Sequence, residues 1–469
     1  MPSKELIYLV FIQNLMARIY PTAILIVVAF LFLLFLTPFQ AFIPMNTSNL
    51  RNHIDYESMA KYWAPIVMQD TSSDNYRADY ITCYTYDGDY AATNNWDNLD
   101  NYPLKAYLYY WVVETETNYF IGYAVFHPRD WSSSLPWIDE HENDLEGVLI
   151  CVQKDGGYGK FLVMETIAHI NFYSYKDYDS YPSSNVTDGN EDIDGDVEFL
   201  TVSAGDSLNQ SGVWCGEHPY IYVEGEGHAI YGDKRWENSG FPDGDGIVYY
   251  PTGIAEEPDS GNDNFCGYAL IPIDDLWNRR YDSEIFSSYG TFDKDNGAGE
   301  AHAPWAWDDS DDGECYPPDF FDDPAYLVDY YHNGLGNFSH VYVGKSWNYV
   351  AETFHNCRSD YDRTIWWKVG SNSFRIHFQN ISVASSDYVQ ILSKNGTVLW
   401  EFSGSDASDF YTPYFNGSIF GVRIITSSDA SWGYSIDFVE EGEVAEVNIG
   451  EFFAYYIFTA IVCALSRKL

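Results

Sequence analysis

Four metal-capable side chains lie close together in the stretch AVFHPRDWSSSLPWIDEHENDLEG, residues 124–147. Asp130 ends an aromatic, strand-like run, and three more candidates follow it: His141, Asp144 and Glu146. If the two pieces are strand ends joined by a loop, all four side chains converge on one cation. Because the set is rich in oxygen, it favours Ca²⁺ or Mg²⁺, with Mn²⁺ as a further candidate, over a closed structural zinc site. The alternative is an acidic loop that only connects two strands in solvent.

The rest of the chain predicts the strands that position these residues. Aromatic and β-branched residues alternate in short runs between Gly, Asn, Asp and Ser clusters, which is typical of a mostly β protein. An amphipathic piece at 53–69 predicts a helix packed on the main domain. The predicted strands are 78–86, 104–114, 118–126, 147–153, 160–170, 197–203, 218–223 and 246–250, at spacings typical of a β-sandwich.

Two apolar segments set the ends of the chain apart. Residues 21–44 form a charge-free run long enough to span a bilayer, preceded by Lys4 and Arg18. A cleaved signal peptide is the alternative, although its apolar core is usually shorter. Residues 452–465 form a shorter hydrophobic helix, either a tilted second anchor or a processed tail. We therefore expect a cell-membrane protein whose bulk is extracellular.

The composition agrees with an outside location. The chain has 24 Lys and Arg against 70 Asp and Glu, a net charge of −46, so its surface repels nucleic acid and attracts cations. Adaptation to a saline medium explains the charge equally well. Six cysteines allow up to three disulfides of unassigned pairing: Cys83, Cys151, Cys215, Cys266, Cys315 and Cys357. Seven Asn-x-Ser/Thr sequons fit a glycoprotein.

The opening stretch resembles a known family. FHPRDW followed by HENDLEG is similar to the necrosis-inducing cytolysins, whose core reads approximately Y-x-P-K-D and then G-H-R-H-D-W-E. The resemblance implies that the four residues named above are divalent-metal ligands. The chain departs from the family pattern at Asn143, which replaces the second His, at Leu145, which replaces Trp, and at Glu140, which replaces Gly. These departures favour binding or structural support over inherited toxicity.

Three histidines at strand ends are candidates to line the same cleft: His127, His169 and His228. The segments IAHINFYSY and PYIYVEGEGHAIYG resemble a related group of vacuolar-sorting-type β-sandwich proteins. Such histidines can support metal ligands or carry protons, and satisfied core histidines are the alternative. Together the two resemblances cover residues 78–345.

Two acidic loops have the alternating oxygens and the glycine of an EF-hand calcium loop. DDSDDGECYPPD offers Asp308 and Asp312, although its Pro-Pro pair excludes the usual exiting helix. TDGNEDIDGDVE offers Asp192 and Asp194. Solvated acidic loops are the alternative for both.

The C-terminal part resembles a CUB domain. FRIHFQNISVASSDYVQILSKNGTVLWEFSG and SIFGVRIITSSDASWGYSIDF have the family's strand order, its D-Y-V motif and its S-D-x-S motif. In calcium-binding CUB domains the two motifs supply ligands, which implies Asp387 and Asp429 here. Gln379 replaces the Glu that the family uses, and a neutral amide weakens a Ca²⁺ site.

These patterns predict four regions. Residues 1–45 are a cytoplasmic tip and transmembrane anchor, 46–345 a large metal-binding β-sandwich, 350–440 a smaller CUB-like sandwich, and 441–469 a linker and hydrophobic segment. No nucleophile and base set stands out, so the sequence favours a non-catalytic recognition or adhesion protein stabilised by Ca²⁺ or Mg²⁺. Its expected partner is an extracellular protein or carbohydrate, bound by exposed aromatic rings. The alternatives are a cytolysin-like protein that acts on membranes or glycolipids, and a metal-dependent hydrolase with His141 or His169 as base.

Overall fold

The computed structural model describes most of the chain between residues 55 and 442. The described ranges are 55–73, 75–130, 141–168, 171–233, 246–279, 282, 285, 291–292, 301–302, 323–344, 347–353, 360–404, 407–427 and 432–442. Residues 1–53 and 54–469 form separate compact units, and only the second is described. Within the described ranges no helix is long and apolar enough to span a bilayer. Both predicted hydrophobic segments lie outside these ranges.

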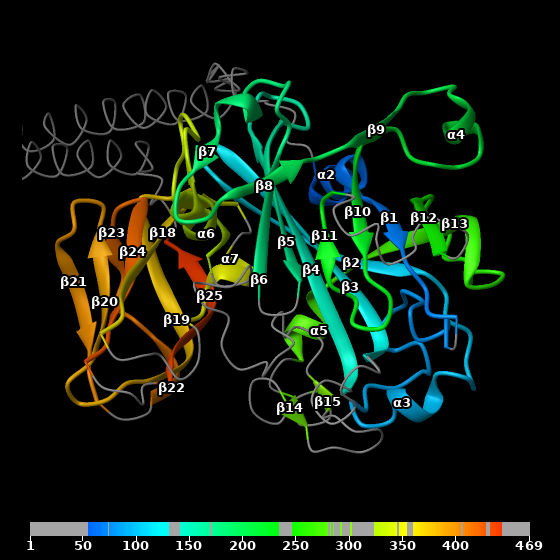
Figure 1. Ribbon diagram of the computed structural model, residues 1–469. Helices are drawn as coiled ribbons and strands as arrows, with labels where there is room; N and C mark the ends of the chain where they lie inside the picture. Colours follow the sequence, from blue (N-terminus) through cyan, green and yellow to red (C-terminus); the bar gives the residue numbers. More distant parts are fainter. Residues whose placement is uncertain are drawn as a thin grey trace, which may run out of the picture. The chain divides into compact units, whose positions relative to one another are not determined.

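The described chain is mostly β, as the sequence predicts (Figure 1). The first part contains α2 (Tyr56–Trp63), β1 (Ile66–Gln69), α3 (Asn95–Asn98), β2 (Tyr107–Thr115), β3 (Asn118–Asp130), β4 (His141–Gln153), β5 (Lys160–Ala168), β6 (Asn171–Lys176), the 3₁₀ turn η2 (Ser183–Asn185), β7 (Thr187–Asp188), β8 (Ile193–Asp196) and β9 (Phe199–Val202). The middle part contains α4 (Ser207–Gln210), β10 (Gly216–Val223), β11 (Ile230–Tyr231), β12 (Gly246–Pro251), β13 (Asn262–Pro272), α5 (Asp274–Asn278), β14 (Thr291–Phe292), β15 (Ala301–His302), α6 (Pro324–Tyr331), β16 (His332–Asn333), β17 (Val341–Val343) and α7 (Trp347–Val350). The last part contains β18 (Asp362–Lys368), β19 (Ser373–Ser382), β20 (Tyr388–Ser393), β21 (Val398–Phe402), β22 (Ala407–Tyr411), β23 (Phe415–Asn416), β24 (Ile419–Ile425) and β25 (Gly433–Glu441).

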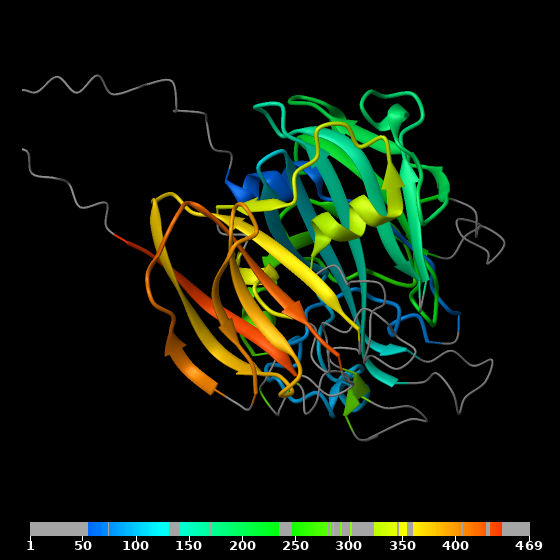
Figure 2. The same ribbon diagram turned by 90° about the vertical axis from the view of Figure 1, so that its left-hand side faces the viewer.

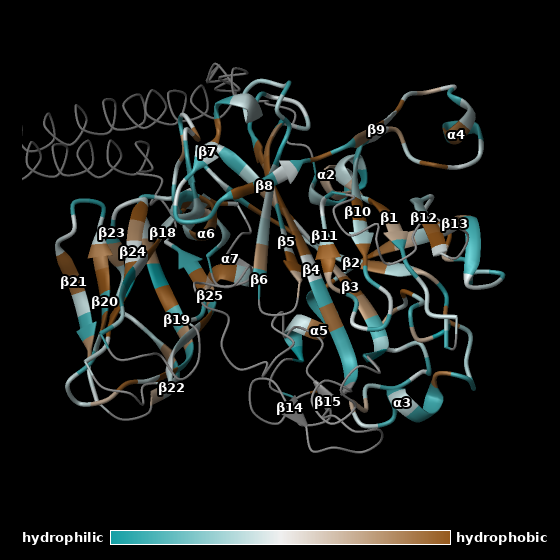
Figure 3. Cartoon of the chain, viewed as in Figure 1, coloured by the Kyte–Doolittle hydropathy of each residue, from teal (hydrophilic) through white to brown (hydrophobic). Residues whose placement is uncertain are grey.

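The main sheet is an antiparallel meander of β2, β3, β4, β5 and β6. It curls back on itself through β13, whose first half pairs with β12 and whose last four residues pair with β2. β12 continues through β1 to β10 and β9, so a second layer faces the meander. Figure 3 shows hydrophobic residues concentrated in these strands, while the connecting segments are mostly hydrophilic.

A buried apolar core fills the space between the two layers. Ile121, Tyr123 and Val125 on β3 are completely buried, and so are Ile221 on β10 and Ile247 on β12. Helix α2 packs on the same core through Met59, Ala60 and Trp63, and Asp55 caps it by accepting a hydrogen bond from the Ser58 amide. The predicted N-terminal helix is therefore confirmed over 56–63, whereas 66–69, which belong to the same predicted helix, form strand β1 of the second layer.

The C-terminal strands form two facing layers (Figure 2). One contains β18, β24, β20 and β21, and the other contains β22, β19, β25 and β23. The aromatic rings of Phe374 and Phe420, one from each layer, stack with their centroids 4.2 Å apart. The layers therefore share one core.

Strand β17 joins this region to the meander. Tyr342 pairs with Thr115 of β2 on one side and with Trp367 of β18 on the other. Its hydroxyl accepts a hydrogen bond from the Ala325 amide at 3.0 Å and contacts Asp323, at the start of α6. The sheet and the core are thus continuous across the predicted boundary near residue 350.

Candidate metal centre

The polar centre lies at the loop end of the β3–β4 hairpin. Across the hairpin, Val125 pairs with Glu146 and His127 pairs with Asp144, next to the completely buried Tyr123 and Val148. Since alternate strand residues point to the same face, the core layer changes from aliphatic to ionisable at this point. Figure 3 shows the corresponding hydrophilic end of β4. The side chains of His127, Asp144 and Glu146 are 0%, 2% and 0% exposed, so the centre is closed to solvent.

The facing layer supplies the other half of the centre. Strand β1 ends at Gln69, and the loop after β10 brings His228 over the hairpin. Asp79 comes from a turn-rich segment and accepts backbone hydrogen bonds from Ser72 at 2.7 Å and from Glu226 at 2.8 Å. Two backbone donors hold the Asp79 carboxylate in the position that His228 faces.

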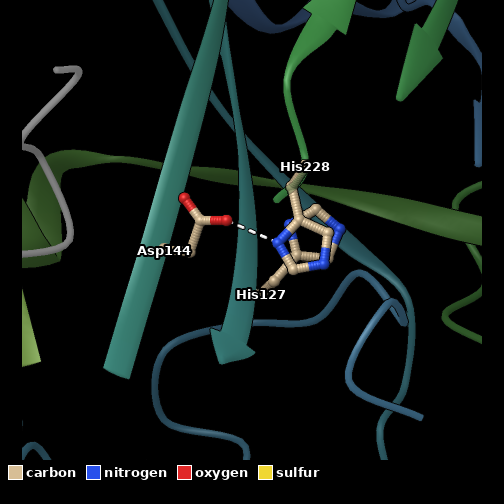
Figure 4. Close-up of side chains that lie close together, drawn as sticks. All are labelled: His127, Asp144 and His228. Carbon is tan, nitrogen blue, oxygen red and sulfur yellow. Dashed lines mark hydrogen bonds and ion pairs between the residues drawn. The ribbon is translucent and has the colours of Figure 1, made fainter. Parts of the chain in front are cut away.

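His228 lies between two carboxylates. Its Nδ1 contacts an Asp144 carboxylate oxygen, and its Nε2 is 3.2 Å from an Asp79 oxygen (Figure 4). Burial alone lowers the pKa of His228, but hydrogen bonds to Asp144 and Asp79, and their charges, raise it to about 10. The ring is therefore an imidazolium at neutral pH and donates from both nitrogens.

His127 lies parallel to His228. The ring centroids are 3.6 Å apart and the planes differ by 7°. Its Nε2 is 3.0 Å from Gln69 Oε1, and its buried Nδ1 has no hydrogen-bond partner among the described residues. Burial first, and then the charge on His228, hold the pKa of His127 well below its usual range. A neutral ring thus packs on a charged one.

Ligand atoms of His127, Asp144 and His228 all lie within 4.8 Å of one another. Within the ranges that the structure describes, this is the one group of three such residues close enough to surround a metal ion. Figure 4 shows one Asp144 oxygen directed at His228 and the other directed away from both rings. Imidazole and carboxylate are suitable ligands for a divalent ion.

The backbone is strained around the centre. Of the five described non-glycine residues with positive φ, three lie here: Asn143 (65°), Glu226 (71°) and His228 (49°). The Asn143 side chain donates to the Ala92 carbonyl at 2.6 Å and contacts Asn95, so the loop before α3 holds this residue. Such conformations persist only where surrounding contacts determine them, and they are common at functional sites.

The sequence-predicted ligands lie on this hairpin. Asp130 is 1% exposed and stands opposite His141 in the register, while Asp144 and Glu146 lie further along β4. The side chain of His141 is outside the described part. Of the four predicted ligands, Asp144 belongs to the group, and its other members are His127 and His228. The roles predicted for these residues stay predictions.

The other predicted calcium sites do not form clusters among the described residues. Asp192 is exposed, and Asp194 lies on β8, where it accepts a hydrogen bond from the Ser174 amide at 2.9 Å. This segment pairs with β6 as a strand and does not wrap as an EF-hand loop. Asp387 is buried and accepts from the Ser427 amide at 2.7 Å, which closes the turn after β24. The remaining candidates lie outside the described residues: His169, Asp308, Asp312 and Asp429.

The described cysteines form no disulfide. Cys83, Cys151, Cys215 and Cys266 are all free thiols, and Cys315 and Cys357 lie outside the described residues. The three-disulfide framework that the sequence allowed is therefore wrong for this fold. Cys151 and Cys266 are buried among apolar side chains and act as small core residues.

Sequence reasoning missed Gln69 and Asp79. Gln69 follows the apolar run IVM, and Asp79 lies in a segment that was predicted as the strand 78–86. That strand prediction is wrong, because the segment consists of turns with one isolated bridge from Thr82 to Phe126. The run TYDGDY, which overlaps the end of the predicted strand, is a turn signal and indicates that no strand continues there.

Comparisons with known proteins give local structural likeness only. No protein-family model matches the sequence. No curated protein matches it. One similar solved structure, described as "Toxin fold for microbial attack and plant defense", is 13% identical, with 35% of this chain and 50% of that chain covered and a TM-score of 0.18. Two structures of NLPPya, one with mannosamine and one with glucosamine, are each 14% identical, with 36% of this chain and 50% of theirs covered and a TM-score of 0.17. The match spans half the length of these neighbours.

Proposed function

We propose that this protein is a membrane-anchored extracellular recognition protein whose large β region is stabilised by a divalent cation. The observation that carries the proposal is the buried group of His127, Asp144 and His228, with ligand atoms within 4.8 Å of one another. A cation bound by His127 and Asp144 joins β3 to β4, and the contact of Asp144 with His228 joins them to the loop after β10. The binding of an ion to the folded state alone stabilises that state by mass action.

The charge around the centre supports a cation. The two carboxylates on either side of His228, Asp79 and Asp144, are at most 2% exposed. Burying carboxylates is costly unless positive charge accompanies them. A divalent ion supplies two positive charges in one place, in addition to the His228 imidazolium.

Burial favours a structural role over hydrolysis. A catalytic metal needs an open coordination position for water or substrate. Here the side chains of His127 and His228 are 0% exposed and Asp144 is 2% exposed. The non-catalytic hypothesis is therefore the better supported one.

The recognition surface that we propose is the outer face of β19, β22 and β25, in the region with CUB-like sequence. Arg375 lies over the rings of Tyr411 and Tyr414, 4.2 and 4.9 Å from their centroids. These two rings are 46% and 48% exposed, and Phe438 nearby on β25 is 41% exposed. Exposed aromatic rings that are held in place by the Arg375 guanidinium offer flat stacking surfaces for an extracellular protein or a carbohydrate.

Thermal unfolding of the full-length protein in detergent micelles tests the cation. After chelation, adding a divalent ion at about 100 times its Kd should stabilise the protein by about 2.7 kcal/mol, seen as a higher melting temperature. Asp144→Asn should abolish this gain, because it removes a ligand charge. Asp192→Asn, the same change on an exposed loop, should keep it. A melting temperature that no divalent ion alters would refute the proposal.

A further inference from the structure

The hydrogen bonds of the two stacked histidines decide which nitrogen can reach an ion. His228 uses Nδ1 for Asp144 and Nε2 for Asp79. Coordination by His228 would require breaking one of these contacts in the buried centre. Its role is therefore to hold the Asp144 carboxylate.

Gln69 determines the tautomer of His127. The Gln69 amide nitrogen lies 3.0 Å from the Asp70 carbonyl and 3.2 Å from the Glu224 carbonyl. Carbonyl oxygens only accept, so the amide group must face them with its nitrogen and face His127 with its oxygen. His127 Nε2 therefore carries the proton and donates to Gln69 Oε1. The Nδ1 atom is buried and has no hydrogen-bond partner among the described residues, so a proton there would lack an acceptor and the atom keeps its lone pair instead.

The parallel stack limits how the two rings can act together. Because the planes differ by only 7°, in-plane lone pairs on the two rings cannot both point at one ion between them. The buried Nδ1 of His127 has no described partner, whereas both nitrogens of His228 are engaged. One imidazole is thus available, together with an Asp144 carboxylate oxygen, and ligand atoms of these residues lie within 4.8 Å of one another.

We infer that the centre binds a transition-metal ion of the Zn²⁺ or Co²⁺ class, which accepts nitrogen ligands, through His127 Nδ1 and Asp144, with Gln69 as the positioning residue that fixes the His127 tautomer. Ca²⁺ and Mg²⁺ prefer oxygen ligands, whereas imidazole suits first-row transition metals. The inference rests on the proposed cation and replaces the sequence-based preference for Ca²⁺ or Mg²⁺. Hydrogen-bonded partners of this kind orient a ligating imidazole and raise its basicity.

Metal titration of the chelated full-length protein in detergent tests this assignment. Co²⁺ should give visible d–d absorption that Zn²⁺ displaces, and millimolar Mg²⁺ or Ca²⁺ should not. His127→Phe keeps a flat ring on His228 but removes both nitrogens, and it should weaken Zn²⁺ binding at least about 100-fold. Gln69→Leu should weaken it about 10- to 100-fold, while Gln69→Glu, which keeps an acceptor for Nε2–H, should restore most of the affinity.

The outcomes separate this inference from the proposed function. If a divalent ion binds but prefers Mg²⁺ or Ca²⁺, or if neither His127→Phe nor Gln69→Leu changes the affinity, the nitrogen-ligand assignment is wrong and the cation proposal stands. If no divalent ion binds the wild-type protein, both are wrong. If the His127→Phe protein does not fold, the Zn²⁺ affinities of Gln69→Leu and Gln69→Glu are compared instead. Equal affinities in these two variants would show that the nitrogen-ligand assignment is wrong.

Discussion

The pKa of each of the two buried histidines in this fold depends on the groups that surround it. His127 and His228 have the same side chain and the same complete burial, yet one is neutral and the other charged. The difference is that His228 faces two carboxylates, while His127 faces an amide oxygen and the charged ring. Asp79 and Gln69 therefore determine the chemistry of the centre as much as the histidines do.

Glu191 gives a pH-dependent prediction at the same scale. Burial first, and then the charges of Asp194, Glu165 and Asp192, raise the pKa of Glu191 from its ordinary 4.5 to about 7. A carboxyl whose pKa is higher in the folded chain favours folding fully below pH 4.5 and loses that contribution as the pH rises through 7.

We therefore expect the stability of the wild-type protein to fall more between pH 5 and pH 8 than that of Glu191→Gln, which stays neutral. Denaturant unfolding of both proteins at the two pH values measures this difference. Equal losses of stability in the two proteins would show that Glu191 titrates as an ordinary surface carboxyl.

The sequence identified some residues of the centre and could not identify others. Asp144, His127 and His228 carry a signal, because ionisable residues flank apolar strand-like runs there. Gln69 and Asp79 carry none, since they act through hydrogen bonds to segments over 50 residues away, such as Gln69 with His127. Spacing along the chain does not encode such contacts. The spacing also suggested an oxygen-rich site. It does not show that the pairing of β3 with β4 brings the His127 ring next to Asp144.

At the scale of elements, the β3–β4 hairpin is the scaffold of the centre. Both strands have 13 residues, and their inner halves lie in the core while their ends carry the ionisable residues. The sequence predicted the inner halves correctly at 118–126 and 147–153, but it ended β3 too early and began β4 too late. In the sequence, the charged residues at 127–130 and 141–146 resemble a loop. In the structure, His127, Asp130, Asp144 and Glu146 are buried.

Gly122 tests how tightly this hairpin is packed. It pairs with Trp111 of β2, and a Cβ at Gly122 would lie 2.1 Å from the Trp111 ring. Gly122→Ala should therefore destabilise the protein by about 1–3 kcal/mol through overpacking, measured by denaturant unfolding.

Gly157→Ala is the matched control for this substitution. Gly157 is exposed, and the nearest atom to its added Cβ is 3.4 Å away, so the change in stability should be within about 0.5 kcal/mol. If Gly122→Ala were as mild as Gly157→Ala, the Trp111 ring would have room to move and the packing described here would be wrong.

For the whole molecule, the predicted mostly β class is confirmed, and the predicted arrangement as two β-sandwiches stays a prediction. Alternation indicates strands, but the curl through β13 and the link through β17 depend on pairings between distant segments. The predicted division near residue 350 stays a prediction, and the pairings of Tyr342 on both sides show a sheet that is continuous there. Composition alone could not reveal this continuity.

The net charge of −46 affects where cations gather on this molecule. An acidic molecule attracts cations to its surface, but surface attraction is diffuse and screened by salt. The buried group at the hairpin end differs, because its ligand atoms are held at fixed positions by two facing layers. We therefore propose that a specific ion binds there, as distinct from cations attracted to the surface.

Anomalous diffraction from crystals of the full-length protein grown with Zn²⁺ tests the central claim most directly. Data collected on both sides of the zinc absorption edge should show a peak at the hairpin end, about 2.0–2.1 Å from His127 Nδ1 and bound by Asp144. A hairpin end without an anomalous peak, with His228 still between Asp79 and Asp144, would contradict the account.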